Sequence, residues 1–156
     1  SICKVAAEFS GVEHRIEFVR EVDGVKYYND SIASSPTRTI ACLKAFKDKL
    51  ILLAGGYDKH IPFEPMTPYV VEKVKTLILT GTTAKSIEAA VKADKDYRPG
   101  HPEIIKVGDY AEAVEKAHEL AAPGDIVALS PASASFDAYP NFVARGKHFK
   151  ELVNKL

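Results

Sequence analysis

The chain contains the apolar run Leu50-Ile51-Leu52-Leu53-Ala54, which leads directly into Gly55-Gly56-Tyr57-Asp58-Lys59. The apolar residues are consecutive rather than alternating with polar ones, so the pattern predicts a strand that is covered on both faces. Three further runs have the same continuous character, at residues 77–79, 104–107 and 126–129. Runs of this kind are typical of a parallel sheet with helices packed on both sides.

The first part of the chain differs from this pattern. Asp23-Gly24 separates two candidate strands, residues 16–22 and 25–28, and an Asp-Gly pair between strands is a strong hairpin signal. We therefore predict an α/β fold, namely an open, mostly parallel Rossmann-like sheet with helices on both faces and an N-terminal β-hairpin.

Three helices have recognisable sequence signals. Ser35-Pro36 places a capping residue before a proline at the first helical position. Asp109 is followed three residues later by Glu112, as in a capping box. The third helix is predicted near the C-terminus, with an apolar stripe made of Phe142, Phe149, Leu152, Val153 and Leu156. Residues 94–102 are predicted to form an exposed loop.

The composition excludes several classes of protein. The chain has 156 residues, 46% of them hydrophobic, and its 21 basic and 21 acidic residues give a formal charge of zero. We expect no nucleic-acid partner, because no basic stripe is present. We expect no membrane insertion, because no apolar run approaches the roughly 20 residues that span a bilayer. Two cysteines without metal-type spacing favour a reducing cytoplasm, and the dispersed histidines form no metal-ligand set.

Four unusual segments follow predicted strands: residues 29–34, 55–59, 81–83 and 130–137. Ligands of open α/β sheets bind outside the carboxyl ends of the strands, so we expect these segments to converge on one edge. Each also has an ordinary structural interpretation. Residues 55–56 and 81–83 can be tight turns, the second with a helix cap, and the serine-rich segment 130–137 can be a plain helix entry.

Several side chains in these segments suit an anionic or nucleotide ligand. Ser135 and Phe136 can offer backbone N–H groups to a carboxylate at a helix N-terminus. Asp30 can accept from ribose hydroxyls or form an ordinary Asx-turn. Arg15 can bind phosphate oxygens or be structural, and Lys59 can be a plain surface lysine. Nucleophilic catalysis is not expected, because the serines have no His-Asp partner in the sequence.

From Gly11 onward the chain resembles the C-terminal domain of the Mur ligases. The resemblance is carried by four segments in order: residues 11–17 (Gly-Val-Glu-His-Arg-Ile-Glu), 29–31 (Asn-Asp-Ser), 55–59, and 130–137 leading to Asn141-Phe142 and Arg145-Gly146. The serine-rich motif followed by Phe-x-x-Arg-Gly resembles the members of the family that add D-glutamate. The resemblance also implies that residues 1–10 are a linker or helix stub from a missing central domain, and that residues 11–156 form the amino-acid-binding domain.

The resemblance implies an ATP-dependent ligase that adds D-glutamate to UDP-N-acetylmuramoyl-L-alanine through an acyl phosphate, in peptidoglycan precursor synthesis. It places D-glutamate against Ser34, Lys59, Ser135, Phe136 and Phe142. The P-loop and most magnesium ligands belong to the central domain of such enzymes, so the isolated chain is expected to be inactive and to hold no catalytic residue of its own.

The resemblance also places ATP against Arg15, Asn29 and Asp30. At one position the chain departs from the family pattern, because Ile32 stands where many members have lysine. Two alternatives remain open at this point: the corresponding domain of a folylpolyglutamate synthetase, and a free-standing nucleotide-binding α/β module.

Overall fold

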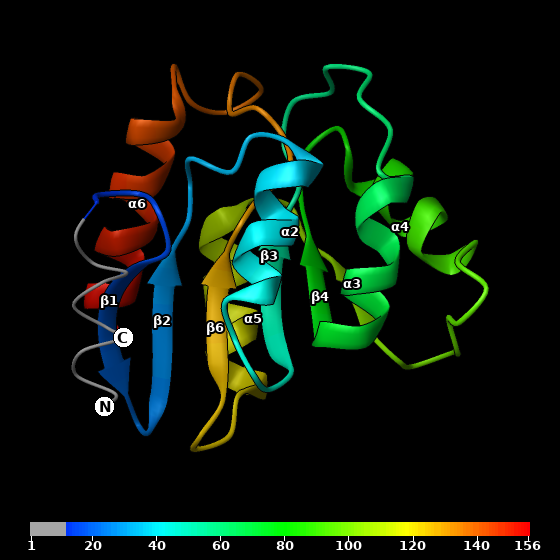
Figure 1. Cartoon of the computed structure of the whole chain (residues 1–156). Helices are drawn as coiled ribbons and strands as arrows, with labels where there is room; N and C mark the ends of the chain where they lie inside the picture. The colour runs from blue at the N-terminus through cyan, green and yellow to red at the C-terminus, as the bar shows by residue number, and fades with distance from the viewer. Residues whose placement is uncertain (1–11) are drawn as a thin grey trace.

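The computed structural model describes residues 12–156. Within them, six strands form one sheet in the order β1-β2-β6-β3-β4-β5 (Figure 1). The strands are β1 (Glu17–Val22), β2 (Val25–Asn29), β3 (Leu50–Ala54), β4 (Val74–Leu79), β5 (Glu103–Lys106) and β6 (Ile126–Leu129). Only the β1–β2 pair is antiparallel among the described strands. The predicted fold class is therefore confirmed, whereas the expected linker or helix stub at 1–10 lies outside the described residues.

The hairpin between β1 and β2 forms where the sequence predicted it. Asp23 and Gly24 both have positive φ, 52° and 80°. This is the requirement of a type I′ turn, whose twist matches that of the two strands it joins. The hairpin places the antiparallel strand β1 at one edge of the sheet.

Helices cover both faces of the sheet (Figure 1). One face carries α2 (Pro36–Lys44), α3 (Thr67–Lys73) with the short 3-10 helix η1 (Glu64–Met66), and α4 (Ala84–Lys92); the other carries α5 (Tyr110–Leu120) and α6 (Phe142–Asn154). Strand β3 lies between the two layers. Leu50, Leu52 and Ala54 pack in the first layer, and Ile51 and Leu53 pack in the second. This explains why five apolar residues follow one another in β3.

The helix starts agree with the sequence in part. Helix α2 begins at Pro36, but the prediction that Ser35 caps it was wrong, because the Ser35 side chain makes no capping hydrogen bond. Asp109 does cap α5, accepting from the Glu112 N–H at 2.8 Å. The Glu112 carboxylate accepts from Gly108 N–H rather than closing the capping box on Asp109. Residues 94–102 form the expected loop between α4 and β5, and most of them are exposed.

The order of the strands creates a crevice at one edge. Strand β6 lies between β2 and β3. The chain leaves β2 toward α2 on one face, and it leaves β6 toward α6 on the other. Neighbouring connections that depart to opposite faces open a space outside the carboxyl ends of the strands, which is the usual ligand position in such sheets. Figure 1 shows the loops that follow β2, β3, β4 and β6 gathered at that edge.

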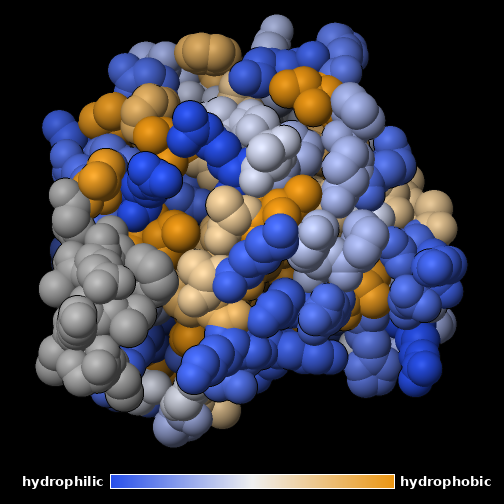
Figure 2. All heavy atoms as spheres, in the orientation of Figure 1, coloured by the Kyte–Doolittle hydropathy of each residue, from blue (hydrophilic) through white to orange (hydrophobic). Residues whose placement is uncertain are grey.

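Figure 2 shows one face of the molecule coloured by hydropathy. Small apolar groups are separated there by hydrophilic side chains. Among the helices of residues 12–156, none combines the length and the apolar character needed to cross a bilayer.

Candidate functional site

The four segments predicted to meet at one edge do so, and hydrogen bonds join their backbones. The Gly55 N–H donates to the Pro131 carbonyl at 2.9 Å, and the Thr83 N–H donates to the Gly56 carbonyl at 3.1 Å. The Ala132 N–H donates to the Ala33 carbonyl at 2.9 Å, which links the loop after β6 to the loop after β2. The edge is therefore one connected structure rather than four independent loops.

Gly55 and Gly56 are needed because neighbouring backbone lies against them. A Cβ added to Gly55 would overlap the Thr80 carbonyl oxygen, and one added to Gly56 would overlap the Ala134 carbonyl oxygen. Gly55 also has a φ of 107°, which favours glycine. The interpretation of this pair as a plain strand-to-helix turn was wrong, because the next helical residue after β3 is Glu64 of η1.

Thr83 joins loops instead of capping a helix. It occupies the N-cap position of α4, yet its side chain makes no cap hydrogen bond. Its Oγ1 accepts from the Gly56 N–H at 2.9 Å and lies 2.9 Å from the Ser133 Oγ. The predicted turn at residues 81–83 is present, but the Thr83 hydroxyl bonds to the loops after β3 and β6 instead of capping α4.

Arg145 lies beneath the edge and binds two of the loops. Its guanidinium donates to the Ser31 carbonyl and to the Ser133 carbonyl, both at 2.9 Å. A longer contact of 3.5 Å reaches the Ser34 hydroxyl. Burial lowers the pKa of Arg145, but a guanidinium stays charged in proteins, so a cation lies directly under the candidate site. The sequence pattern showed Arg145 only as part of the Phe-x-x-Arg-Gly motif and did not indicate this role.

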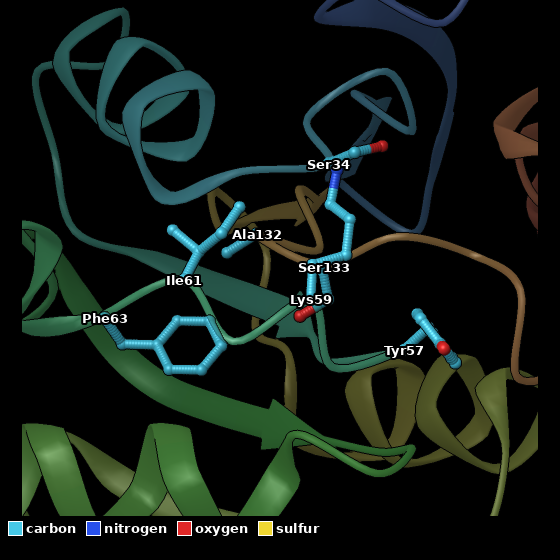
Figure 3. A pocket seen from close by; sticks show the side chains of 7 residues that line it. All are labelled: Ser34, Tyr57, Lys59, Ile61, Phe63, Ala132 and Ser133. Atoms are coloured by element: carbon cyan, nitrogen blue, oxygen red, sulfur yellow. The ribbon is translucent and has the colours of Figure 1, made fainter.

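Ser34 and Lys59 line one small hollow at this edge, together with Tyr57 and Ser133 (Figure 3). In Figure 3 the Lys59 side chain crosses the hollow with its amine end toward Ser34. The Lys59 amine has no hydrogen bond or ion pair with any residue of 12–156, so it is free to bind an anion. The hollow holds only about 10 Å³, enough for about one water molecule. The hollow is therefore too small to enclose an amino acid.

The serine-rich segment is joined to the loop that lines this hollow. An antiparallel bridge joins Tyr57 to Ala134, with the Tyr57 N–H donating to the Ala134 carbonyl at 2.8 Å. The backbone N–H groups of Ser135 and Phe136 find no acceptor within residues 12–156, and the Ser135 hydroxyl makes no hydrogen bond there. These groups are available to a ligand carboxylate.

The segment is a turn and not the first turn of a helix. The Ser135 carbonyl accepts from the Ala138 and Tyr139 N–H groups, at 3.0 and 2.8 Å. Helix α6 begins only at Phe142, where Asn141 caps it by accepting from Ala144 N–H. The expectation that Ser135 and Phe136 stand at a helix N-terminus was therefore wrong, although their N–H groups remain unpaired.

Arg15 and Asp30 line a second cavity of about 190 Å³ beside α2. Asp30 is almost fully buried, and its two oxygens accept from the Ile16 N–H at 3.1 Å and from the Ser130 hydroxyl at 2.8 Å. Burial raises the pKa of Asp30 to about 6, and these two hydrogen bonds and the nearby Arg15 partly oppose the rise. The alternative interpretation as a simple Asx-turn does not describe its contacts, because its carboxylate bonds to residues distant in the sequence.

The backbone beside Arg15 is held in a strained form. His14 and Ile16 have φ values of 66° and 45°, which is unusual for a residue with a β-branched side chain such as isoleucine. Such positions cost of order 1–3 kcal/mol each and persist where neighbouring contacts enforce them. Here the Ile32 N–H donates to the His14 carbonyl at 3.1 Å, and Asp30 holds the Ile16 N–H. The position of Arg15 is thus fixed from both sides.

Asn29 is buried beside His14 and Glu17. Its amide nitrogen donates to Glu17 Oε1 at 3.0 Å and lies 2.8 Å from the His14 Nδ1, and its oxygen accepts from the Ser31 N–H at 3.1 Å. These bonds orient the amide, so the His14 Nδ1 must be the acceptor. Asn29 is completely buried, and its predicted contact with ATP stays a prediction.

Phe142 opens α6 and is half-buried. Its carbonyl accepts from the Ser31 hydroxyl at 2.7 Å, and its ring lies edge-on to His14 with centroids 6.0 Å apart. The structure thus places Ser34 and Lys59 in one hollow, joins that hollow to the Ser135-Phe136 segment through the Tyr57–Ala134 bridge, and places Arg15 with Asp30 in another cavity. Within residues 12–156 no three His, Cys, Asp or Glu side chains are grouped as metal ligands.

The structure is thus an α/β sheet whose carboxyl edge carries a hollow lined by Ser34 and Lys59 and a separate cavity lined by Arg15 and Asp30. Residues 14–133 match the family described as Mur ligase, glutamate ligase domain. The chain belongs to this family.

Two relatives are close in sequence. The UDP-N-acetylmuramoylalanine--D-glutamate ligase of Clostridium novyi (strain NT) is 58% identical over 157 residues, and the protein of the same name from Acetivibrio thermocellus is 57% identical over 158 residues. The alignments cover 100% and 99% of this chain but only 34% of each relative. The chain therefore spans about a third of the length of these ligases.

Solved structures share the fold at low sequence identity. Folylpolyglutamate synthase of Mycobacterium tuberculosis complexed with ADP has a TM-score of 0.63 at 12% identity, covering 90% of this chain and 32% of that protein. Folylpolyglutamate synthase of Thermotoga maritima has a TM-score of 0.59 at 17% identity, covering 92% and 31%. These likenesses show the same α/β architecture.

Proposed function

We propose that this chain is the amino-acid-binding domain of an ATP-dependent ligase that joins D-glutamate to UDP-N-acetylmuramoyl-L-alanine in peptidoglycan precursor synthesis. The observation that carries the proposal is that unpaired donors lie close together at this edge: the Lys59 amine lines the hollow beside Tyr57, and Tyr57 is bridged to Ala134, the residue before the unpaired N–H groups of Ser135 and Phe136. Glutamate has two carboxylates, and charge-assisted hydrogen bonds to such groups contribute about 1.5–3 kcal/mol each. Relatives that are named for D-glutamate ligation and are 57–58% identical support the same reading.

The proposed reaction proceeds in two steps. The muramoyl-alanine carboxylate attacks the γ-phosphorus of ATP, giving an acyl phosphate and ADP. The amine of D-glutamate then attacks the carbonyl carbon, loses a proton, and expels phosphate. The described residues hold and orient D-glutamate in this scheme, while Arg15 and Asp30 contact one side of ATP. The remaining ATP contacts, the magnesium ligands and most of the UDP-linked substrate site are assigned to the rest of a longer, cytoplasmic enzyme, and the chain alone is proposed to be inactive.

The folylpolyglutamate synthetase alternative shares the fold but is less well supported. The structures of that kind are only 12–17% identical to this chain, whereas the muramoyl ligases exceed 50%. A free-standing nucleotide-binding module would bind ATP without further domains. Each alternative predicts a different substrate from the D-glutamate ligase, so one assay distinguishes the three functions.

The test measures ATP-dependent phosphate release by the full-length protein that contains this chain, with UDP-N-acetylmuramoyl-L-alanine and either D- or L-glutamate. We expect turnover with D-glutamate only. Lys59→Ala and Ser135→Ala should each raise KM for D-glutamate by roughly tenfold or more, because each removes a donor to a carboxylate.

Matched controls are available on α4, where Lys85 and Ser86 are exposed. Lys85→Ala and Ser86→Ala should leave KM for D-glutamate unchanged. Turnover with L-glutamate and a folate acceptor would support the synthetase alternative instead. ATP binding by the 156-residue chain alone, without ligation in the full-length protein, would support the free-standing module.

A further inference from the structure

The cavity beside α2 contains a second arginine with no role in the scheme above. Arg38, in the first turn of α2, lines this cavity together with Arg15 and Asp30. Ile32 and Ala41 add apolar surface to the same lining. The cavity therefore brings two guanidinium groups and one carboxyl group to a space of about 190 Å³.

The charges in this cavity are not balanced by the protein. Neither the Arg15 nor the Arg38 guanidinium has a hydrogen bond or ion pair with any residue of 12–156, and both residues are exposed. Asp30 is the sole carboxyl group of the lining, and each of its oxygens accepts one protein hydrogen bond, from Ile16 N–H and from Ser130 O–H, which leaves further lone pairs for a ligand hydroxyl. An anion bound in the cavity that both guanidinium groups line would be attracted by both of them.

The start of α2 adds to the positive potential. Pro36 occupies the first helical position and Ser35 makes no side-chain cap, so the N-terminal N–H groups of the helix are not covered by a side-chain oxygen. The positive end of the helix dipole favours an anion on the same side as Arg38. The guanidinium groups are the principal observation here, and the helix end only reinforces them.

We infer that Arg38 is a second phosphate-binding residue of the nucleotide site, acting beside Arg15. The inference rests on the proposed function, which places ATP at this cavity. Asp30 receives the ribose, the apolar lining contacts the sugar or base, and the two guanidinium groups bind phosphate oxygens. Guanidinium groups suit this task because their planar N–H donors match phosphate oxygens in pairs.

One consequence concerns the segment from Asp30 to Arg38. Ser34 lines the hollow beside Lys59, whereas Asp30 and Arg38 line the cavity beside α2. A single segment of nine residues would then contribute side chains to both ligand sites, and Arg145 holds this segment through its hydrogen bonds to Ser31.

The test uses the full-length protein and compares Arg38→Ala, Arg38→Lys and the control Arg98→Ala. Arg98 is exposed in the loop before β5, at the opposite edge of the sheet. For Arg38→Ala we expect KM for ATP to rise about tenfold, with KM for D-glutamate and the midpoint of thermal unfolding unchanged. KM for ATP should rise less in Arg38→Lys, and it should not change in Arg98→Ala. An Arg38→Ala enzyme with KM for ATP within twofold of wild type would overturn the inference.

Calorimetric titration with MgADP distinguishes this failure from failure of the proposed function. If wild type does not ligate D-glutamate but binds MgADP, and Arg38→Ala weakens that binding about tenfold, the inference stands and the D-glutamate proposal falls. If wild type ligates D-glutamate and Arg38→Ala binds MgADP normally, the proposed function stands and the inference falls. If wild type neither ligates nor binds MgADP, both fall.

Discussion

Arg145 and Ser31 are joined by two hydrogen bonds, from Nε to the Ser31 hydroxyl at 3.0 Å and from Nη2 to the Ser31 carbonyl at 2.9 Å. Arg145 is only 1% exposed, and every acceptor of its hydrogen bonds is an uncharged oxygen. Asp137 is the carboxylate that interacts with this guanidinium electrostatically, without a hydrogen bond to it, so the positive charge is only partly balanced. Ser34 and Ser133, which line the hollow, thus lie against a buried positive charge, as the proposed carboxylate ligand requires.

Replacing Arg145 by lysine tests this arrangement. Lysine keeps the charge but cannot donate in three directions from a planar group, so we expect the free energy of unfolding to fall by about 2–4 kcal/mol. Urea unfolding of the 156-residue chain, followed by circular dichroism, measures the change. The exposed Arg98→Lys is the control and should change stability by less than about 0.5 kcal/mol. Equal stability of the Arg145→Lys variant and wild type would show that the buried network contributes nothing.

Gly146→Ala tests the contact between α6 and His14. A Cβ at residue 146 would overlap the His14 imidazole ring, so we expect a loss of about 1–3 kcal/mol although alanine is the better helix former. In a His14→Gly background the ring is absent, and glycine accepts the φ of 66° at that position. Most of the cost of Gly146→Ala should then disappear. A double-mutant cycle by urea unfolding measures the coupling, and additive effects of the two changes would contradict it.

The pH dependence of stability tests the burial of Asp30. The folded protein holds this proton up to about pH 6, whereas an unfolded aspartate with a pKa of 3.8 loses it earlier. Stability from this group is therefore complete below about pH 4 and is lost as the pH rises through 6, by about 3 kcal/mol in total. Asp30→Asn keeps an acceptor for the Ile16 N–H and cannot ionise. The variant should gain stability relative to wild type by about that amount between pH 4 and pH 7.

His14 has the opposite pH dependence, because burial lowers its pKa and protonation becomes costly as the pH falls. Both wild type and Asp30→Asn contain His14, so the difference between them reports Asp30. A difference that does not change with pH would mean that Asp30 is ionised in the folded state down to its usual pKa.

Thr83→Val tests the hydroxyl that joins the loops. Valine is nearly isosteric but leaves the Gly56 N–H and the Ser133 hydroxyl without this partner, so we expect a loss of about 1–3 kcal/mol. Thr83→Ser keeps the oxygen and should lose less than 1 kcal/mol. Amide hydrogen exchange at Gly56 should accelerate in the valine variant alone. Protection at Gly56 that is equal in both variants would contradict the assigned bond.

The strands could be predicted from the sequence, because a strand that is buried on both faces consists of consecutive apolar residues. All of β3 is apolar, and Asp23-Gly24 marks the hairpin without tertiary information. The convergence of the loops could also be predicted, since parallel strands end at the same edge. Helix α3 escaped prediction because it spans seven residues, too few to show helical periodicity.

The site was predicted less completely, for a physical reason. A charged residue such as Arg145 is normally exposed, so its burial depends on the four carbonyl and hydroxyl oxygens that accept its hydrogen bonds, and the sequence does not show these contacts. Ser35 and Thr83 had the right residue type for caps, but tertiary contacts determine where a hydroxyl bonds. The roles of Ser34, Lys59, Ser135, Phe136, Phe142, Arg15, Asn29 and Asp30 toward ligands stay predictions.

The Tyr57–Ala134 bridge has a consequence for changing the substrate preference of such a domain. Because the backbone of one loop is paired with that of the other, their lengths and conformations must match. A graft of residues 55–59 from a ligase with different amino-acid preference would lose its pairing partner unless residues 130–137 came from the same donor. The two loops therefore act as one structural unit, and a chimaera should exchange residues 55–59 and 130–137 together or exchange neither segment.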